Sequence, residues 1–365
     1  MQINSVETVK ELLIQNHTLQ KESLFLQCGD CIIRVQSDSK ILLAELKQYF
    51  RHLLIAETFP TLTVIAIQSE ILKLSISFQD WPREPGKKGR KDSYYNIEGG
   101  RLIYKMRTGM LFLQSENYKI AAGPCLANSN QIINFINSQH MNWLQQRDWL
   151  ICHAAAIVDK KYAYAVAGFS GGGKSTFMLS LMDDDKINFL SNDRLFICNI
   201  KAIYAEGIAK LPRINPGTIV NNPRLHALIP AQRREQLLNL PKQQLWDLEE
   251  KYDVDIESIY GPGRIAKSKP LKAFIVLNWQ HHSEKEFNIE TINLQNRLDL
   301  LPAIMKSPGP FYQDSKGQFL SDLNIFDPEK YLTLLTQIKV YEVSGKVNFE
   351  LLKDYFYQNI LDQEK

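Results

Sequence analysis

The sequence has few cysteines, little net charge and no long hydrophobic run, and each of these shortages excludes a class of protein. Its five cysteines, at positions 28, 31, 125, 152 and 198, are scattered among 365 residues and odd in number. Such usage does not fit a disulfide framework and is typical of the reducing cytoplasm. The formal net charge is only +3, so the total charge gives no electrostatic reason to expect binding to nucleic acid.

Signals for membrane insertion and export are also lacking. Apolar runs such as 274–277 are far shorter than the roughly 18 residues that a membrane-spanning helix requires. The first residues have neither the basic start nor the apolar core of a signal peptide. We therefore expect a cytoplasmic protein that makes no contact with a membrane.

What the sequence does contain is a glycine-rich segment between a predicted strand and a predicted helix. The apolar run 162–167 leads into Gly168-Phe169-Ser170-Gly171-Gly172-Gly173-Lys174-Ser175, and Thr176 continues into an apolar helix. Strand, glycine turn, Lys-Ser and helix in this order are typical of a phosphate-binding loop. The alternative is a glycine turn that binds nothing, but such a turn has no need of Lys and Ser after three glycines.

Each residue type in this segment has a reason to be there. Glycines let backbone N–H groups approach an anion and adopt positive φ angles, and the start of the helix adds its dipole. Lys174 is expected to reach the β- and γ-phosphates, and the Ser175 hydroxyl to bind Mg²⁺. The implied cofactors are ATP and Mg²⁺. The predicted nucleotide-binding residues are Gly168, Ser170, Gly171, Gly172, Gly173, Lys174, Ser175, Thr176 and Arg213.

The length suggests two domains. We predict a smaller α+β domain over 1–148, for recognition of a partner or substrate, and an α/β phosphate-loop domain over 149–365. Predicted helices include 6–14, 40–54, 129–147, 242–251 and 295–304, and predicted strands include 24–28, 31–35, 62–67, 71–78, 150–158 and 271–278.

Two segments of the first domain have alternative readings. Cys28-x-x-Cys31 could be half of a zinc site, but Gly29-Asp30 between two predicted strands favours a β-hairpin, and no second such pair occurs. The basic segment 82–92 is a predicted loop that either binds an acidic partner or phosphate or is simply solvated; we favour the solvated loop.

Catalytic candidates follow from the needs of phosphoryl transfer, which are positioning, a metal, cations on the phosphates and a carboxylate for the nucleophile. Asp193 follows the predicted strand 187–190 and can be that carboxylate. Glu206 is a second acid that could bind Mg²⁺ through its oxygens. The predicted metal ligands are therefore Ser175, Asp193 and Glu206.

Three cationic or titratable residues complete the candidates. Arg213 and Arg264 lie in loops stiffened by Pro and Gly, which suits a fixed guanidinium on phosphate, although each could also form an ordinary salt bridge. His153 interrupts an apolar strand, where a lone histidine is often a hydrogen-bonded core residue. The predicted catalytic residues are Asp193, His153, Lys174 and Arg264.

These features together resemble the HPr kinase/phosphorylase family, and most closely the HPr-kinase-related proteins of the kinase B group. The resemblance covers about 149–290 and rests on His153 before the loop, the form G-x-S-G-x-G-K-S, Asn192-Asp193, Glu206-Gly207 and Gly263-Arg264. The family's Asp-Asp pair falls on Asn192-Asp193, and its Glu-x-Arg-Gly signature lacks the Arg here. The resemblance implies a phosphate-loop fold related to phosphoenolpyruvate carboxykinase, phosphorylation of a serine hydroxyl by ATP and Mg²⁺, and a homo-oligomer.

Three functions compete. The leading hypothesis is a kinase that phosphorylates a serine on a partner protein. The second keeps the chemistry but transfers the phosphoryl group to a small hydroxyl-bearing molecule such as free serine. The third is a nucleotide-responsive binding protein with little catalysis, which Asn192 in place of an acid keeps open.

Overall fold

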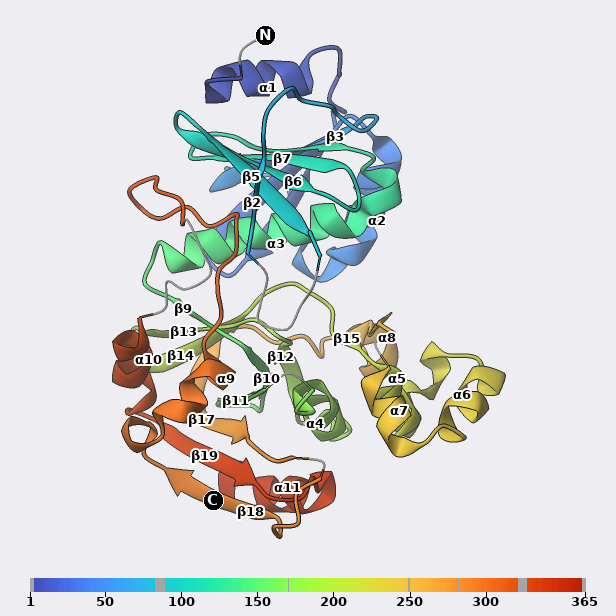
Figure 1. Ribbon diagram of the computed structural model, residues 1–365, viewed down its shortest axis with the longest axis vertical. Helices are drawn as coiled ribbons and strands as arrows, with labels where there is room; N and C mark the ends of the chain where they lie inside the picture. Colours follow the sequence, from blue (N-terminus) through green and yellow to red (C-terminus); the bar gives the residue numbers. More distant parts are fainter. Residues whose placement is uncertain are drawn as a thin grey trace. The chain divides into compact units, whose positions relative to one another are not determined.

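The computed structural model describes residues 3–82, 89–169, 171–248, 250–280, 282–320 and 327–362. They form a mixed α/β structure, which confirms the predicted fold class at this level (Figure 1). The chain divides into two compact units. Unit 1 is Met1–Asp148 with Ser307–Ile325, and unit 2 is Trp149–Lys306 with Phe326–Lys365.

Unit 1 is built on one mixed sheet with the strand order β1-β2-β3-β8-β7-β6-β5-β4. Its strands are β1 Leu24–Cys28, β2 Cys31–Ser37, β3 Leu62–Gln68, β4 Gln79–Asp80, β5 Asp92–Ile97, β6 Gly100–Lys105, β7 Met110–Ser115 and β8 Lys119–Gly123. Its helices are α1 Val6–Ile14, α2 Lys40–Tyr49, η1 Arg51–Leu53, η2 Leu126–Asn128 and α3 Ser129–Gln145.

Two predictions for unit 1 have clear outcomes. The hairpin is confirmed, because β1 and β2 pair antiparallel with Cys28 opposite Cys31 and Gly29 adopts a positive φ of 56° in the turn. The predicted strand 71–78 is wrong. Its alternating apolar residues Leu72, Leu74 and Ile76 pack against the core of α1 and the sheet without entering a β-ladder. The predicted basic loop lies mostly outside the described residues, since 83–88 are not described.

A late segment of the chain belongs to unit 1, whereas we predicted one boundary at residue 148. The buried Arg101 guanidinium donates to the carbonyl oxygens of Pro310 (3.2 Å) and Leu320 (2.7 Å). The Asn142 side chain donates to the carbonyl of Phe311 at 2.7 Å. Buried hydrogen bonds of this kind hold the segment to unit 1, and they join residues 169 to 219 positions apart.

Unit 2 contains a larger mixed sheet with the order β12-β10-β11-β17-β14-β13-β9, while β19 pairs with both β17 and β18. Its strands are β9 Leu150–Cys152, β10 Ala154–Val158, β11 Ala163–Gly168, β12 Asn188–Ser191, β13 Leu195–Asn199, β14 Ile203–Gly207, β15 Arg213–Ile214, β16 Tyr252–Asp253, β17 Lys269–Leu277, β18 Asn288–Ile292 and β19 Lys339–Ser344. Strands β15 and β16 form a separate pair.

The helices of unit 2 are α4 Lys174–Leu181, α5 Pro216–Val220, η3 Pro223–Leu228, α6 Ala231–Leu238, α7 Lys242–Asp247, α8 Ile256–Tyr260, η4 Leu294–Asn296, η5 Leu298–Leu300, α9 Leu301–Ile304, α10 Pro328–Leu335, α11 Phe349–Tyr355 and the π-helix η6 Phe356–Ile360. The predicted helix 242–251 therefore ends earlier, and 295–304 is three short helical turns.

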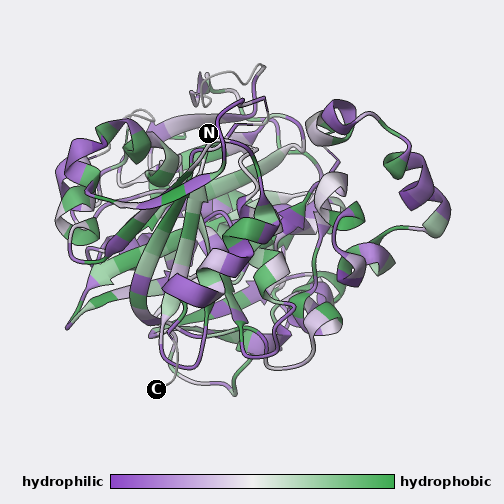
Figure 2. Cartoon of the chain, turned by 90° about the horizontal axis from the view of Figure 1, so that it is seen from below, coloured by the Kyte–Doolittle hydropathy of each residue, from purple (hydrophilic) through white to green (hydrophobic). Residues whose placement is uncertain are grey.

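Both faces of the central strands of unit 2 are buried. Alternate residues of β11, such as Tyr164 and Val166, pack with α4 and α11 through Phe177 and Leu352. The small residues between them face the opposite core, which includes α9 and α10. Strands covered on both faces need apolar residues at every position, and Figure 2 shows hydrophobic colour along these strands.

The predicted strand 150–158 is two strands that break at His153. β9 pairs with β13, whereas β10 pairs with β11 and β12. The backbone N–H of His153 donates instead to the carbonyl of Ile304 at 2.6 Å. The break places the imidazole at the start of β10. Among the described residues, none of the helices has both the length and the apolar character needed to cross a bilayer.

Candidate active site

Several strands of unit 2 begin or end at one edge of the sheet. β10 and β11 are antiparallel, so β10 begins where β11 ends, with Ala154 opposite Ala167. β12 is antiparallel to β10 and β17 is parallel to β11, so both also end at this edge. Ligands of open α/β sheets bind outside such strand ends. The described residues at this edge are His153, Gly168, Phe169, Gly171–Ser175, Asn192–Arg194 and Asn278–Gln280.

The glycine-rich segment follows β11 directly and leads into α4. Gly171 and Gly173 have φ angles of 79° and 87°, in the region that glycine adopts without strain. A Cβ on Gly173 would also lie 2.5 Å from the Phe349 ring. The described part of the segment therefore has a backbone that requires glycine, while Ser170 lies outside the described residues.

Lys174, the first residue of α4, lies over the start of the loop. Its Nζ donates to the carbonyl oxygen of Gly168 at 2.9 Å. Burial, opposed by the negative charge of Asp193, lowers the pKa of Lys174 to about 8. Lys174 is therefore a cation near neutral pH that has lost much of its hydration, and this suits it to hold an anion.

The next two residues face the neighbouring elements. The Ser175 hydroxyl donates to Asn192 Oδ1 at 2.7 Å, and the Thr176 hydroxyl lies 2.7 Å from that of Thr218 in α5. The first contact brings two oxygen donors together at the start of α4. Amide and hydroxyl oxygens are ligands that Mg²⁺ accepts, and Mg²⁺ usually keeps several waters and binds substrate phosphate as well.

The Ser175 hydroxyl, the Asn192 amide oxygen and the neighbouring Asp193 carboxylate are the groups that could hold Mg²⁺. No group of three or more His, Cys, Asp or Glu side chains in the described part of the chain forms a metal site. The donor set therefore fits a cation that is held mainly by phosphate and water, and it does not fit a closed structural metal centre.

Asp193 is the centre of a charged cluster. Its carboxylate lies 3.1 Å from His153 Nε2 and 3.3 Å from Lys306 Nζ, and 48% of its side chain is exposed. Its φ of 73° is unusual for a residue other than glycine. Strained backbone of this kind often marks functional sites.

The protonation states of the cluster follow from its contacts. Loss of water around Asp193 would by itself raise its pKa, but the hydrogen bond from His153 and the charge of Lys306 hold that pKa well below its usual range. Burial lowers the pKa of His153, and the bond to Asp193 only partly opposes this. At neutral pH the pair is therefore a carboxylate and a neutral imidazole.

Three cations near Asp193 were not predicted from the sequence: Lys306, Arg194 and Lys210. Lys306 is far away in the chain, and the bridge between Cys152 and Met305 brings it to this edge. Arg194 Nε lies 4.0 Å from Asp193. Burial first, and then the charge of Arg194, lower the pKa of Lys210 to about 8, while Asp193 opposes the shift.

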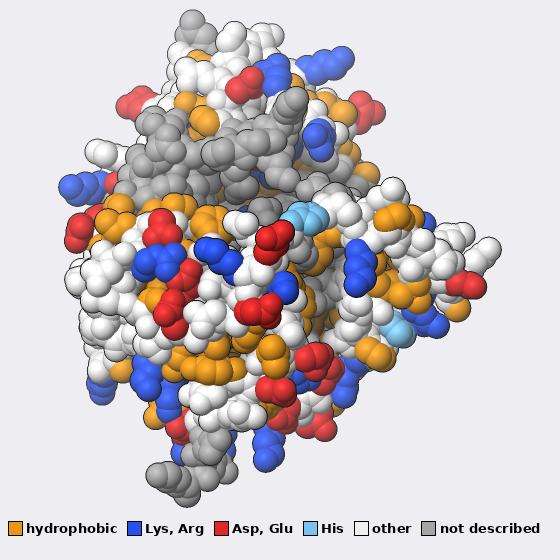
Figure 3. All heavy atoms as spheres, turned by 60° about the horizontal axis from the view of Figure 1, so that its bottom comes forward, with side chains coloured by type: hydrophobic (Ala, Val, Ile, Leu, Met, Phe, Trp, Pro, Cys, Tyr) orange, Lys and Arg blue, Asp and Glu red, His pale blue; other side chains and the backbone are white. Residues whose placement is uncertain are grey.

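On the face displayed in Figure 3, Lys and Arg side chains are interspersed with Asp and Glu, without a continuous patch of either charge. Lys210 stands three residues before Arg213, in the loop that Pro and Gly stiffen, but the sequence pattern there points to Arg213.

Arg264 is not at the site, which corrects its predicted catalytic role. Its side chain is only 9% exposed, and all five of its N–H donors are used. The acceptors include the carbonyls of Met182, Asp184 and Ile187, just beyond the C-terminal end of α4. The loop lies at the other end of α4, about 12 Å away along its eight residues.

Arg213 and Glu206 lie on different strands of unit 2, β15 and β14. Arg213 is exposed in β15 and forms an ion pair with Asp253 at 2.9 Å. Glu206 is the penultimate residue of β14, which ends where β13 begins, with Gly207 opposite Leu195. A Cβ on Gly207 would collide with the Leu190 carbonyl, so this end of β14 approaches the end of β12. Glu206 stays a predicted metal ligand.

Comparisons with known proteins give little. No family model matches the chain, and no curated protein matches its sequence. Among solved structures, the HPr(Ser) kinase/phosphatase from Coxiella burnetii is a weak neighbour with 10% identity and a TM-score of 0.28. The match covers 57% of this chain and 88% of that one. A likeness at this level carries no functional argument, so the family resemblance of the motifs stays a prediction.

Proposed function

We propose that unit 2 is a Mg²⁺-dependent kinase that transfers the γ-phosphoryl group of ATP to a serine-type hydroxyl. One observation carries the proposal. The glycine-rich loop with Lys174 and the carboxylate of Asp193 with its cations lie at the same edge of one sheet. Phosphoryl transfer depends on this combination of an anion cradle, cations and a carboxylate.

The residues have separate roles in this proposal. Lys174 and the loop N–H groups hold the phosphates, and Lys306 adds positive charge beside Asp193. The acceptor oxygen forms a bond to the γ-phosphorus while the bond to the β–γ bridging oxygen breaks, and ADP leaves with that electron pair. Asp193, which is ionised at neutral pH, orients the hydroxyl and takes its proton.

His153 is a positioning residue. Its Nε2 lies within hydrogen-bond distance of the Asp193 carboxylate, and it stays neutral near pH 7 because its pKa is lowered. It can thus fix the carboxylate without cancelling its charge. Bound Mg²⁺ would supply charge neutralisation at the β- and γ-phosphates, held by Ser175 and by Asn192 or Asp193, with Glu206 as a further predicted ligand.

The acceptor is the finer part of the proposal. A serine on a partner protein is the first candidate, because the motifs resemble those of a protein-serine kinase family, and unit 1 is available to recognise it. A small molecule such as free serine is the second. The third function, a nucleotide-dependent switch with little turnover, is favoured by Asn192, whose amide stands beside Ser175 where the related motif has an acid.

The test measures product formation. The full chain is incubated with Mg²⁺ and ATP labelled at the γ-phosphate, with either native lysate protein or a pool of hydroxyl-bearing metabolites. We expect a labelled product from wild type, and at least 100-fold less from Lys174→Met and Asp193→Asn. Lys201→Met, at an exposed position of unit 2, should behave like wild type.

The outcomes separate the candidates. Labelled protein supports the first acceptor, and a labelled small molecule detected by mass spectrometry supports the second. Tight ATP binding without any labelled product that depends on both Lys174 and Asp193 would contradict the kinase and favour the switch.

A further inference from the structure

A concave region adjoins the loop on the side of β17, away from β12 and Asp193. It is an open pocket of about 460 Å³, and its lining includes Gly171 and Gly172 of the loop, Leu277 at the end of β17, and residues from α7. Pockets of about 300 to 1,000 Å³ are typical of small-molecule sites. The pocket is outside the carboxyl ends of β11 and β17, where open α/β sheets bind ligands.

The chemistry of this pocket differs from that around Asp193. Its described lining residues include two indoles, from Trp246 and Trp279, and three carboxamides, from Gln243, Asn278 and Gln280, but no Lys, Arg, Asp or Glu. Indole faces favour a planar aromatic ligand. Carboxamides offer both donors and acceptors to a polar ring edge; the Asn278 amide already donates one N–H to Glu342 at 2.7 Å. The lining also includes the imidazole of His282. No Lys or Arg among the described lining residues offers a permanent charge to an anionic group, whereas an uncharged heterocycle fits between aromatic and carboxamide side chains.

One wall of the pocket is rigid and attached to the loop. Trp279 is buried, and its indole N–H donates to the carbonyl of Gly172 at 2.9 Å. Its ring packs edge to face against Phe349 with centroids 4.8 Å apart, and Phe349 also touches the position where a Cβ of Gly173 would be. Whatever lies against Trp279 is therefore held at a fixed place relative to the loop.

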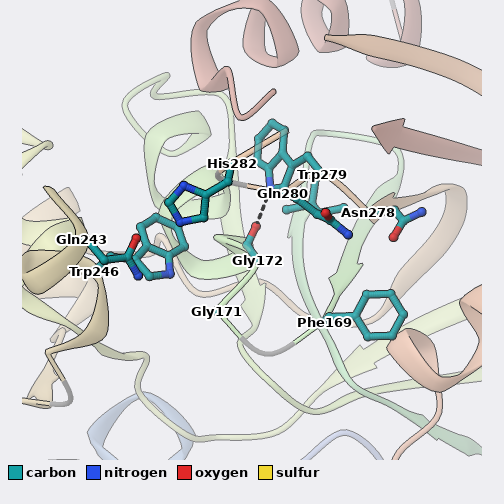
Figure 4. A pocket seen from close by; sticks show the side chains of 10 residues that line it. Phe169, Gly171, Gly172, Gln243, Trp246, Asn278, Trp279, Gln280 and His282 are labelled. Carbon is teal, nitrogen blue, oxygen red and sulfur yellow. Dashed lines mark hydrogen bonds between the residues drawn. The ribbon is translucent and has the colours of Figure 1, made fainter. Parts of the chain in front are cut away.

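The opposite wall comes from α7. Figure 4 shows Trp246 and Gln243 on one side, with His282 next to Trp246. Trp279, Asn278 and Gln280 are on the other side, and Gly171 and Gly172 lie between the two groups. A Cβ on Gly171 would lie 3.6 Å from the Trp246 indole nitrogen. An added side chain there would fill space between the loop and this ring. Gly171 therefore lies close to the Trp246 ring, so the loop borders the pocket directly.

We propose that the pocket between Trp246 and Trp279 binds the nucleobase of the nucleoside triphosphate whose phosphates lie in the loop. This inference rests on the proposed function, because it needs the loop to hold the phosphates. It adds that the base lies on the β17 side of the loop and that the γ-phosphate points to the Asp193 side. It also gives α7 a role that no motif in the sequence indicates.

The test compares two ligands that differ by the nucleoside. Isothermal titration calorimetry measures binding of ATP and of inorganic tripolyphosphate to the full chain and its variants. Stacking of a base on an aromatic side chain changes affinity about 5- to 140-fold on alanine substitution. We expect Trp246→Ala to weaken ATP binding by a factor in this range and to leave tripolyphosphate binding unchanged.

Controls make the result specific. Leu238→Ala, at an exposed position of the neighbouring helix α6, should change neither affinity. Trp246→Phe keeps an aromatic face and should recover most of the ATP affinity. Unchanged tripolyphosphate binding by Trp246→Ala also shows that the variant is folded.

The possible failures are distinguishable. If Trp246→Ala binds ATP as wild type does, or loses both ligands equally, the nucleobase inference is overturned. If wild type binds neither ligand, or if Lys174→Met leaves both affinities unchanged, the proposed function itself fails, and the inference fails with it.

Discussion

The two sides of the glycine-rich loop have opposite chemistry. On one side, Lys306, Arg194 and Lys210 surround the carboxylate of Asp193. On the other, Trp246 and Trp279 face a pocket whose described lining carries no Lys, Arg, Asp or Glu. The difference indicates how one loop could fix the orientation of a nucleotide. The charged phosphate end is stabilised only on the Asp193 side, and the aromatic base only on the pocket side. The predictions below test this contrast, beginning with the largest effect.

Removal of the charge on Asp193 is expected to act on the charged side alone. Asp193→Asn removes the group that orients and deprotonates the acceptor, so the rate of transfer should fall about 10²- to 10⁴-fold. ATP affinity measured without Mg²⁺ should not fall, because the lost charge repels the phosphates. Steady-state transfer rates and calorimetric ATP affinities measure both quantities.

The matched control is Asp354→Asn, at an exposed position of α11. It should leave both rate and affinity unchanged. If Asp193→Asn transfers phosphate at the wild-type rate, the proposed role of the Asp193 carboxylate in transfer is wrong.

Arg264 should affect stability and neither side of the loop. Arg264→Met leaves several buried carbonyls beyond the end of α4 without their donor, and we expect the free energy of unfolding to fall by about 3 kcal/mol. Urea denaturation measures this change. The transfer rate of the folded variant should be close to wild type, and a selective loss of transfer with unchanged stability would return Arg264 to the site.

The two sides should also differ in their response to pH. The pKa of Lys174 is lowered to about 8, so Lys174 is protonated below pH 8 and becomes neutral above it. Affinity for tripolyphosphate should therefore be nearly constant from pH 6.5 to 7.5 and fall up to about tenfold per pH unit above pH 8. Binding at high pH must take up a proton.

Adenosine, which carries no phosphate, should bind equally at pH 7 and pH 9. Calorimetry in buffers of different ionisation enthalpy detects the proton uptake. If tripolyphosphate affinity did not change with pH, or if adenosine affinity fell with it, the proposed difference in charge between the two sides would be wrong.

The smallest expected effect concerns the link between the two sides. Trp279→Phe keeps an aromatic wall but removes the N–H that donates to Gly172, which costs about 1 kcal/mol. Since this bond holds the loop itself, ATP and tripolyphosphate should weaken together, about fivefold. Loss of ATP affinity alone would mean that the N–H of Trp279 does not support the loop.

The local patterns of the sequence were sufficient for part of this account. The glycine turn, Lys174 and the strand before them predict the loop, because the motif is continuous in the chain. The hairpin at Cys28 and Cys31 was likewise predictable, since Gly-Asp between apolar strands is a local signal. The mixed α/β class followed from the same periodic patterns.

The remaining features depend on contacts between distant residues. Lys306 is 113 positions from Asp193, and it reaches the site through a bridge beside β9. Arg264 has a Gly-Arg turn that fits a phosphate site, but its partners are backbone carbonyls, which leave no mark in the sequence. The break at His153 depends on Ile304, and the apolar alternation of 71–78 serves packing without β-pairing.

The most direct test of the central claim is a crystal structure of the full chain with Mg²⁺ and a non-hydrolysable ATP analogue. The account predicts the phosphates in the loop, the γ-phosphorus between Lys174 and Asp193, and the base against Trp246 and Trp279. Phosphates bound elsewhere, or a γ-phosphate that points away from Asp193, would contradict it.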